Sequence, residues 1–384
     1  MNKKKGSKVV PNVRFKGFTD DWKQRKLGEV ATFINGRAYS QDELQNSGKY
    51  KVLRVGNFYT NDSWYFSDME LDEKYYAKDG DLLYTWSATF GPHIWHGDKV
   101  IYHYHIWKVE LSNILEKRFA VQLLEQDKDK ILSDKNGSTM VHITKSGMEQ
   151  KKVLLPPSIK EQANIGEYFS SIDHLITLHQ QKITLLTKLK KAMLEKMFPK
   201  KGSVIPEFRF NGFANAWEQR KLGDEAEEIL AGGDIDKEKA VDDGVYPIYA
   251  NALTNDGIVG YYDDFYRVKA PAVTVTGRGE VGRARARMID FTPVVRLLAV
   301  RSNHDCYFLE NAINNHKVVV ESTGVPQLTV PQLSSYDICF PKDIVEERKI
   351  GTYFNQLDHL ITLHQRKLDM LKKLKSACLS EMFI

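Results

Sequence analysis

The sequence contains the same eight residues, DHLITLHQ, at 173–180 and again at 358–365. A longer match precedes them, PNVRFKGFTDDWKQRKLGEV at 11–30 and PEFRFNGFANAWEQRKLGDE at 206–225. A repeat of this length constrains the fold first, because each copy must form the same kind of structural unit. We therefore expect two matching frames, related by a pseudo-two-fold internal repeat, around central segments (roughly 31–136 and 226–321) whose sequences look unrelated.

The repeat divides the 384 residues into four predicted segments. Strand-rich domains of mixed α+β type are expected at 1–157 and 200–342, where alternating and apolar runs are broken by Gly, Asn and Asp. Long helices are expected at 158–199 and 343–384. One architecture, written twice around different contents, suggests a protein with two different specificities.

The two helical segments carry matching caps and matching apolar stripes. Ser158 with Glu161, and Asp343 with Glu346, are spaced as capping boxes. Apolar residues at heptad spacing follow, on a helix of about 60 Å, which is too long for the interior of a small domain. We predict that the two helices pack on each other, antiparallel, as a coiled coil; two amphipathic helices, each packed on its own domain, are the alternative. The predicted seam and partner-docking residues are Ile172, Leu175, Ile176, His179, Leu357, Leu360, Ile361 and His364.

The stretch TGRGEVGRARAR at 276–287 is the most informative for chemistry. It contains G-x-G-x-x-G, but an alternating strand pattern follows it instead of an apolar helix, which argues against a dinucleotide fold. In a strand, Arg283, Arg285 and Arg287 point to one face, where an anion is needed to cover them. With Arg278 in the preceding turn, they predict a surface for phosphate or guanine. A merely solvated strand face is the alternative.

The first domain has a corresponding turn, TWSATFGPHIW at 85–95, which offers Ser87, Thr89 and His93. Its histidines match no strong metal-ligand spacing, so we favour polar contacts to DNA over a metal site. Two loops before the helices, GSTMVHIT and STGVPQLT, occupy equal places in the repeat and hold small hydroxyl residues that can bond phosphates or base edges. They add the candidates Ser138, Thr139, His142, Ser322, Thr323 and Gln327, with plain structural turns as the alternative.

Composition and missing motifs exclude several classes of protein. The longest apolar runs fall short of a membrane span, and three scattered cysteines fit a reducing cytoplasm, where we expect the protein. The net charge of +5 is compatible with nucleic acid without requiring it. The sequence has no P-loop, no HExxH and no methyltransferase motif, and no set of nucleophile, base and orienting group stands out. We therefore predict a binding protein, not an enzyme.

The duplicated frames resemble those of the specificity subunit of Type I restriction–modification systems, over essentially the full chain. The motifs are FRFNGF…WEQRKLG before the second domain and LPPSIKEQANIGEYFSSIDHLITLHQ in the first helix. The second copy reads FPKDIVEERKIG, a mild departure from the Pro-Pro and Glu-Gln pairs of the first copy. The resemblance implies two target recognition domains separated by two long antiparallel coiled-coil helices.

The resemblance also implies a function. Each domain would read one half of a bipartite target on double-stranded DNA, and the helices would act as a ruler between the halves. Two modification (methyltransferase) subunits would dock on the helices and frames, and ATP-driven restriction subunits would join them. S-adenosylmethionine, ATP and Mg would belong to those partners, with no cofactor in this chain. A coiled-coil scaffold that binds only protein, or a detached enzyme fragment, are the competing interpretations.

Overall fold

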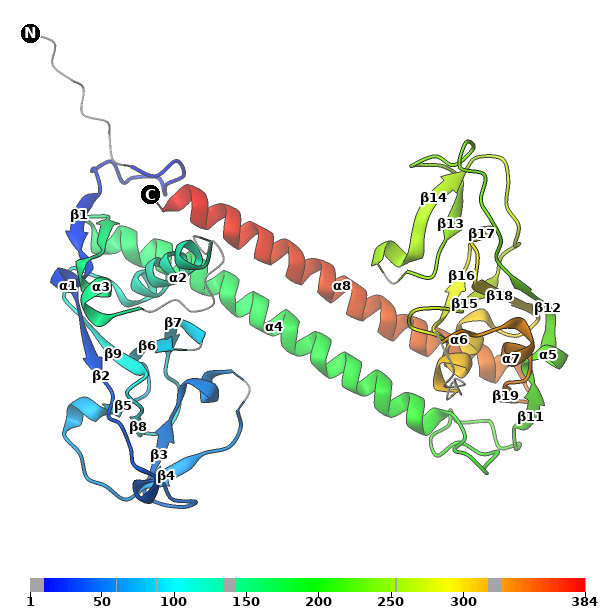
Figure 1. The fold of residues 1–384 in the computed structure, drawn as a ribbon, viewed down its shortest axis with the longest axis horizontal. Helices are drawn as coiled ribbons and strands as arrows, with labels where there is room; N and C mark the ends of the chain where they lie inside the picture. Colours follow the sequence, from blue (N-terminus) through cyan, green and yellow to red (C-terminus); the bar gives the residue numbers. More distant parts are fainter. Residues whose placement is uncertain are drawn as a thin grey trace, which may run out of the picture. The chain divides into compact units, whose positions relative to one another are not determined.

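The computed structural model describes residues 10–59, 61–87, 89–133, 143–252, 254–316 and 326–383. Two compact units divide the chain, and each long helix contributes to both of them (Figure 1). Unit 1 comprises Met1–Leu178 together with Leu368–Ile384, and unit 2 comprises His179–Lys367. Because each unit combines segments that are distant in the sequence, each is described by itself below.

The two long helices are α4 (Ile159–Met197) and α8 (Ile344–Met382), each of 39 residues. The Ser158 hydroxyl accepts a hydrogen bond from the Glu161 N–H at 3.3 Å, and the Asp343 carboxylate accepts one from the Val345 N–H at 2.8 Å. Each predicted capping box has a second hydrogen bond, from the N-cap N–H to the Glu carboxylate, and this part of the prediction is wrong. The carboxylates of Glu161 and Glu346 do not return to their N-caps, because each is held by an arginine of the preceding frame.

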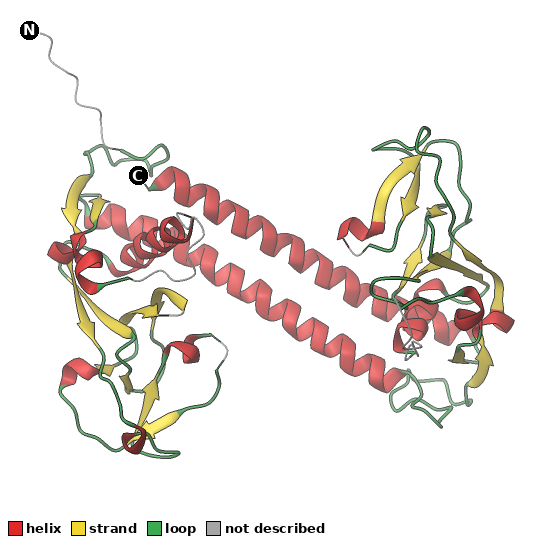
Figure 2. Ribbon diagram, in the orientation of Figure 1, coloured by secondary structure: helices red, strands yellow, loops and turns green. Residues whose placement is uncertain are grey.

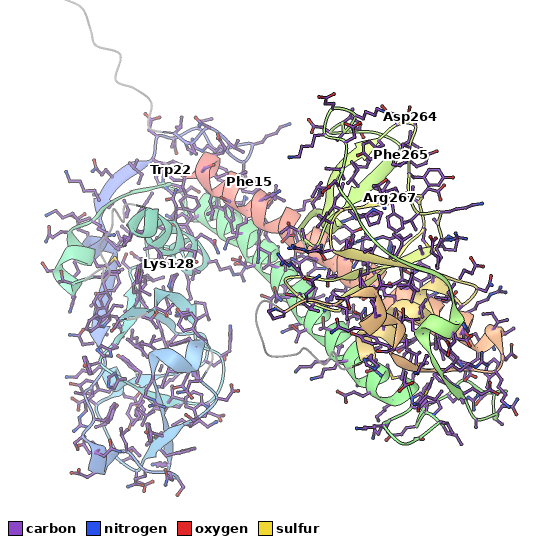
Figure 3. The ribbon with its side chains drawn as sticks, turned by 45° about the vertical axis from the view of Figure 1, so that its right-hand side comes forward. Phe15, Trp22, Lys128, Asp264, Phe265 and Arg267 are labelled. Atoms are coloured by element: carbon purple, nitrogen blue, oxygen red, sulfur yellow. The ribbon has the colours of Figure 1, made fainter. Side chains whose placement is uncertain are left out.

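These arginines explain why the frame is repeated. Arg14 holds Glu161 through two hydrogen bonds of 2.5 and 2.8 Å, and Arg209 holds Glu346 in the same way at 2.5 and 2.7 Å. Both carboxylates are buried, and Phe15 and Trp22 of the first frame lie next to the helices in unit 1 (Figure 3). The repeated phrase Arg-Phe-x-Gly-Phe therefore supplies the arginine of a buried ion pair at the start of each long helix.

The helices pack on each other, antiparallel, in both units, which confirms the predicted pairing. In unit 1, Lys375 of α8 contacts Asp173 of α4 at 2.6 Å. In unit 2, Lys190 of α4 contacts Asp358 of α8 at 2.6 Å. The two ion pairs are copies of each other under the repeat, because Asp358 and Lys375 lie 185 residues after Asp173 and Lys190.

The repeated octapeptide takes part in this pairing. His179 and His364, which occupy the same place in the two copies, meet with their Nδ1 atoms 2.9 Å apart in unit 2. Four of the other predicted seam residues are buried or half-buried and pack in the hydrophobic core of their own unit: Ile172, Ile176, Leu357 and Ile361. Leu175 and Leu360 are exposed instead, at 44 and 40 %.

Domain 1 of unit 1 contains two four-stranded sheets and a two-stranded ribbon. The sheets have the strand orders β2-β9-β6-β7 and β4-β3-β8-β5, and β1 pairs with β10. The elements are β1 (Lys23–Lys26), α1 (Leu27–Val30), β2 (Ala31–Asn35), β3 (Tyr50–Leu53), β4 (Tyr65–Ser67), β5 (Tyr76–Ala77), β6 (Leu82–Ser87), β7 (Thr89–Ile94), β8 (Val100–Tyr102), β9 (Ile106–Leu111), α2 (Lys117–Ser133), α3 (Lys145–Gln150) and β10 (Lys152–Leu155).

Domain 2 of unit 2 repeats most of this topology, with three strands instead of four in its second sheet among the described residues. Its sheets have the orders β12-β18-β15-β16 and β14-β13-β17, and β11 pairs with β19. The elements are β11 (Glu218–Lys221), α5 (Leu222–Glu225), β12 (Ala226–Ala231), β13 (Tyr246–Tyr249), β14 (Ile258–Tyr262), β15 (Ala272–Thr276), β16 (Ala284–Arg287), β17 (Thr292–Pro293), β18 (Leu297–Ser302), α6 (Cys306–Asn315), α7 (Val330–Ser334) and β19 (Asp337–Phe340). The sheets β2-β9-β6-β7 and β12-β18-β15-β16 contain more strand residues and are called the larger sheets below; the others are the smaller sheets. The helix α2 packs on edge strand β7 of the larger sheet in domain 1, and α6 packs on edge strand β16 in domain 2 (Figure 2).

This correspondence shows that two centres whose sequences look unrelated share one strand order. Their sequences differ, but strands β12, β18, β15 and β16 follow the same order as β2, β9, β6 and β7. Because a sheet needs only alternating apolar residues, unlike sequences can satisfy the same pairing. The repeat therefore extends through the centres as well as the frames.

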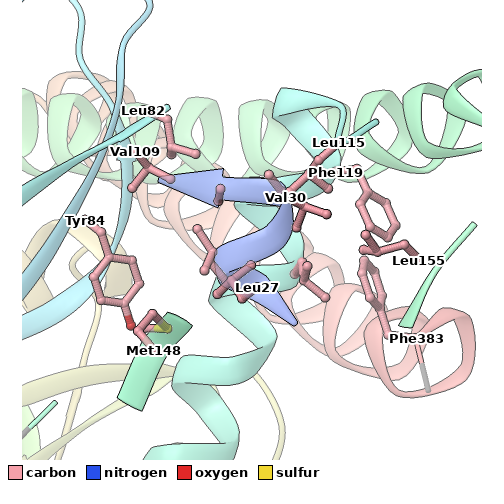
Figure 4. Close-up of a cluster of buried hydrophobic side chains, with 14 of the residues drawn as sticks. Leu27, Val30, Leu82, Tyr84, Val109, Leu115, Phe119, Met148, Leu155 and Phe383 are labelled. Atoms are coloured by element: carbon pink, nitrogen blue, oxygen red, sulfur yellow. The ribbon is translucent and has the colours of Figure 1, made fainter. Parts of the chain in front are cut away.

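Each domain core includes the end of a long helix. In unit 1, Phe383 packs on Phe119 and Trp22, with ring centroids 5.2 and 6.3 Å apart (Figure 4). In unit 2, Phe198 packs on Phe308 and Trp217 at 5.4 and 6.0 Å. The Met-Phe that ends each repeated helix is thus a core element of the opposite copy.

Candidate nucleic-acid interface

The two predicted hairpins, β6–β7 and β15–β16, occupy the same place in the two domains. Each ends in the edge strand of the larger sheet, β7 or β16. In both domains a loop from the smaller sheet reaches this edge strand; it follows β3 in domain 1 and β13 in domain 2. An edge hairpin supported by one loop is therefore the shared geometry of the candidate site.

In domain 2, the predicted strand with alternating arginines is present as β16, and it pairs antiparallel with β15. Arg283 and Arg285 are exposed, and Arg278 is half-buried in the preceding turn. Arg287 differs, because it is only 7 % exposed and its side chain is fully engaged. It contacts the Asp256 carboxylate at 2.6 Å and donates to the Thr274 hydroxyl at 3.0 Å.

The expectation that an external anion covers all three guanidiniums needs correction. Asp256, in the loop after β13, contacts Arg285 at 3.1 Å as well as Arg287. The Arg287 guanidinium also lies over the Tyr249 ring, 3.7 Å from its centroid, a cation–π arrangement. A buried charge needs such a set of partners. Arg287 is therefore placed to hold the loop, whereas Arg283 and Arg285 remain open to a ligand.

A cavity of about 440 Å³ adjoins these arginines in unit 2. It is lined by the β15–β16 hairpin, by α6 and by the last turns of α4, which contribute Lys190 and Lys191. Glu310 also lines it, and burial raises the pKa of this carboxyl despite the hydrogen bond that it accepts from the Ala286 N–H. The two lysines and Asp256 were not predicted as site residues, because only the fold brings them to the hairpin.

In domain 1, His93 lies on β7 and is enclosed by aromatic side chains of the loop after β3. Its ring stacks on Phe58 at 4.1 Å, and its Nε2 atom lies 3.1 Å from the Tyr59 hydroxyl and 3.3 Å from the Thr85 hydroxyl. Burial, with a smaller effect from Lys128, lowers the pKa of His93 to about 4. The imidazole is therefore neutral at physiological pH, with one ring nitrogen a donor and the other an acceptor, and its Nε2 atom is already engaged by these two hydroxyls.

The other predicted residues of this hairpin lie next to its turn. Ser87 ends β6 and pairs with Thr89, the first residue of β7, and the Thr89 side chain is exposed. Lys128 of α2 packs beside the same edge (Figure 3). Its ammonium group pairs with Glu125. Sequence reasoning missed Lys128, because nothing in the spacing of α2 links it to β7.

Further histidines in domain 1 form an aromatic surface. His103, Tyr104 and His105 lie side by side, and Trp86 contacts Tyr104 and His105 with ring centroids 6.2 and 5.1 Å apart. Burial lowers the pKa of His103 to about 4. In the described part of the chain, no group of three or more His, Cys, Asp or Glu could hold a metal ion.

The loop candidates are placed only in part. Ser138, Thr139, His142, Ser322 and Thr323 lie outside the described residues. Gln327 is exposed shortly before α7, whose N-cap is Thr329. The role of all six residues in DNA contact stays a prediction, as it does for the hairpin residues.

A second surface runs along the paired helices. Large apolar side chains, 38–68 % exposed, repeat at equivalent places in the two copies: Leu175, Leu178, Leu185 and Leu189 on α4, and Leu360, Leu363, Met370 and Leu374 on α8. With the buried seam at heptad positions a and d, these eight residues fall at positions c and g. In an antiparallel pair the g positions face each other, so in each unit the stripes lie on one side of the helix pair. We call these eight residues the apolar stripe.

Comparison with known proteins identifies the class that this fold belongs to. The profile of the "Type I restriction modification DNA specificity domain" matches twice, at residues 19–188 and 215–373. The chain therefore belongs to the family of DNA specificity subunits of Type I restriction–modification systems. Specificity subunits are the non-catalytic members of these systems, in agreement with the prediction of a binding protein.

Individual relatives support this assignment. The chain is 28 % identical to the Type I restriction enzyme MjaVIII specificity subunit of Methanocaldococcus jannaschii over 47 % of this chain, and 33 % identical to a putative type I specificity subunit of Mycoplasma pneumoniae over 36 %. These matches span only 43 and 39 % of the two relatives. A putative MjaX specificity subunit of M. jannaschii is 23 % identical over 93 % of this chain and 91 % of its own length.

The fold has a solved counterpart. The crystal structure of a Type I restriction–modification S subunit from M. genitalium superposes with a TM-score of 0.73, covering 98 % of this chain and 99 % of that one at 14 % identity. At this identity the likeness concerns the fold alone. Of the helices formed by described residues, none is long and apolar enough to cross a membrane.

Proposed function

We propose that this chain reads a bipartite sequence on double-stranded DNA, with one domain for each half-site. The observation that carries the proposal is a shared topology with unlike surfaces. Domain 2 presents Arg283, Arg285 and Lys191 at its edge hairpin, whereas domain 1 presents His93 and an aromatic surface at the equivalent place. Equivalent geometry suits equivalent docking on a duplex, and different side chains suit different bases.

The paired helices would set the separation of the two half-sites. Each runs for 39 residues without a break, about 58 Å at 1.5 Å per residue. Inserting whole helical turns at matched places in α4 and α8 should lengthen the unread gap and spare the bases of both half-sites. Altered half-sites with a constant gap would contradict this part of the proposal.

Two modification subunits would dock on the apolar stripe, and restriction subunits would join the complex. The stripe is duplicated by the repeat, which fits two equivalent partners, and exposed apolar patches commonly mark interaction sites. S-adenosylmethionine, ATP and Mg would be held by these partners, with no cofactor in this chain. Replacing Leu185 and Leu189 with Gln should weaken binding of the modification subunit, and Lys188→Gln, at an exposed position of α4 outside the apolar stripe, is the control.

The function itself is tested by a methylation map. The chain would be expressed with its cognate modification subunit in a methylation-free host, and N6-methyladenine would be located by long-read sequencing. A split, asymmetric motif with a fixed gap, lost when this chain is omitted, would support the proposal. Absence of methylation from an assembled complex would favour a protein-binding scaffold without DNA specificity.

A further inference from the structure

The two edge hairpins can be aligned residue by residue through their hydrogen-bonded neighbours. The N–H of Gly36, directly after β2, donates to the Ile106 carbonyl, and the N–H of Gly232, directly after β12, donates to the Leu297 carbonyl. Ile106 of β9 therefore corresponds to Leu297 of β18. Counting two residues onward along each strand makes Lys108 the counterpart of Ala299.

The register of the next strands completes the alignment. Lys108 pairs with Leu83, and Ala299 pairs with Thr274. Across the hairpin, Leu83 pairs with His93 and Thr274 pairs with Arg285. His93 and Arg285 thus occupy the same position on the edge strand of their domains, although their sequences give no alignment there.

Both side chains are held by the same loop of the smaller sheet. In domain 1, the loop after β3 stacks Phe58 on His93 and places the Tyr59 hydroxyl 3.1 Å from its Nε2 atom. In domain 2, the loop after β13 places Asp256 at 3.1 Å from the Nε atom of Arg285. The same position of the edge strand, supported by the equivalent loop, therefore carries His93 in domain 1 and Arg285 in domain 2.

The Arg285 contact leaves a specific recognition group open. Asp256 engages Nε, and the terminal Nη1 and Nη2 atoms make no hydrogen bond with any described residue; the side chain is 57 % exposed. These two nitrogens form the fork that binds the O6 and N7 atoms of guanine. Asp256 is itself held by Arg287, which is buried, so the orientation of the fork is set by a chain of two ion pairs.

We propose that this register position is a base-reading position of each domain: Arg285 specifies a guanine in the half-site of domain 2, and His93 specifies one base pair in the half-site of domain 1. Asp256 and Arg287 are positioning residues for Arg285. The inference rests on the proposed function, and it adds which residue reads in each half and which base Arg285 selects.

The test uses the methylation map of the assembled complex, with Arg285→Ala and His93→Gln introduced singly. Arg285→Ala should relax one guanine position in one half-site, with discrimination there falling about 5- to 150-fold, and should leave the gap and the other half unchanged. His93→Gln should alter one position in the other half only. Arg301→Gln and His96→Gln, outside the hairpin–loop contacts, are the controls.

A positioning role for Asp256 has its own readout. Asp256→Asn should broaden the same base position as Arg285→Ala, and the double variant should be no worse than Arg285→Ala alone, since both changes act through one fork. A merely structural Asp256 would instead lower methylation at all sites and add to the effect of Arg285→Ala.

Three results would overturn the inference. They are an unchanged motif in both variants, relaxation in the wrong half-site, and a uniform loss of binding with the motif intact, which would make Arg285 a phosphate contact. In each case the unmodified complex still yields a split motif. If the unmodified complex yields none, the proposed function fails instead.

Discussion

Removing Arg209 tests whether the repeated frame fixes the long helices through a buried ion pair. The Glu346 side chain is 1 % exposed and Arg209 is 12 % exposed, with two contacts of 2.5 and 2.7 Å. Arg209→Met leaves the carboxylate buried and unpaired, which costs about 3–5 kcal/mol. Unit 2 spans His179–Lys367, a size at which each kcal/mol lowers the unfolding midpoint by about 2–4 °C. We therefore expect a loss of roughly 6–20 °C.

Thermal unfolding, followed by near-ultraviolet circular dichroism, measures this loss. Arg209→Met combined with Glu346→Leu should recover most of the stability, because the uncompensated charge is gone. Lys200→Met serves as the control, since it breaks an exposed ion pair with Glu207 that contributes at most about 1 kcal/mol. A midpoint within about 2 °C of the native chain, or no recovery in the double variant, would refute the reasoning.

Three further variants test other contacts. Burial opposes a charge on His304, but hydrogen bonds and charges of its two carboxylate partners, 2.8 and 2.9 Å away, outweigh burial and raise its pKa. The charged His304 therefore stabilises the fold fully below its ordinary pKa near 6.5, and this stabilisation is lost as the pH rises through its pKa in the folded state. His304→Gln should remove this pH dependence of the free energy of unfolding, measured by urea titrations at several pH values. His179→Leu alone should destabilise the helix pair by about 1–3 kcal/mol by leaving His364 unpartnered, whereas changing both to Leu should be neutral or stabilising in the same titration. Gly351→Ala would place a Cβ 2.0 Å from Asp305, so a drop of about 1–3 kcal/mol is expected, detectable as a lower thermal midpoint.

The long helices could be predicted because their signal is local and repeated. Heptad spacing and a capping residue in each copy are sufficient to locate α4 and α8. The packing of the two helices on each other could be predicted too, because two matching apolar faces can bury each other. The partner of the Glu161 carboxylate could not be predicted, because a capping box and a buried ion pair with Arg14 both require a glutamate at this position.

The candidate site was only partly accessible to sequence reasoning. Alternation identified the strand that carries Arg285, but it could not separate an exposed arginine from a buried one, because both point to the same face. The difference comes from Asp256, which is 31 residues from Arg287 in the chain and reaches it through the fold. The equivalence of His93 and Arg285 likewise depends on strand register, which no local pattern records.

The shared topology leads to a stronger test, a chain that carries the centre of domain 2 in both frames. The junctions are the equivalent ribbons β1–β10 and β11–β19, so 27–151 would be replaced by a second copy of 222–336. The core positions of the two helices largely agree, since Ile165 and Phe169 of α4 correspond to Ile350 and Phe354 of α8. A hydrogen-bonding position next to them differs. In domain 1, the Gln162 side chain accepts a hydrogen bond from the Glu116 N–H at 2.8 Å. In domain 2, the Glu347 carboxylate accepts one from the Asp305 N–H at 3.1 Å and also binds His304.

The graft should therefore need Gln162→Glu. Without it, the transplanted copy of His304 faces a neutral amide and loses a carboxylate that holds its charge, so the graft alone should unfold at lower temperature than the graft with Gln162→Glu. With the substitution, the complex should methylate a symmetric target whose two halves are both the half-site of domain 2. An asymmetric motif from a folded, assembled graft would show that the frames, and not the centres, determine which bases are read.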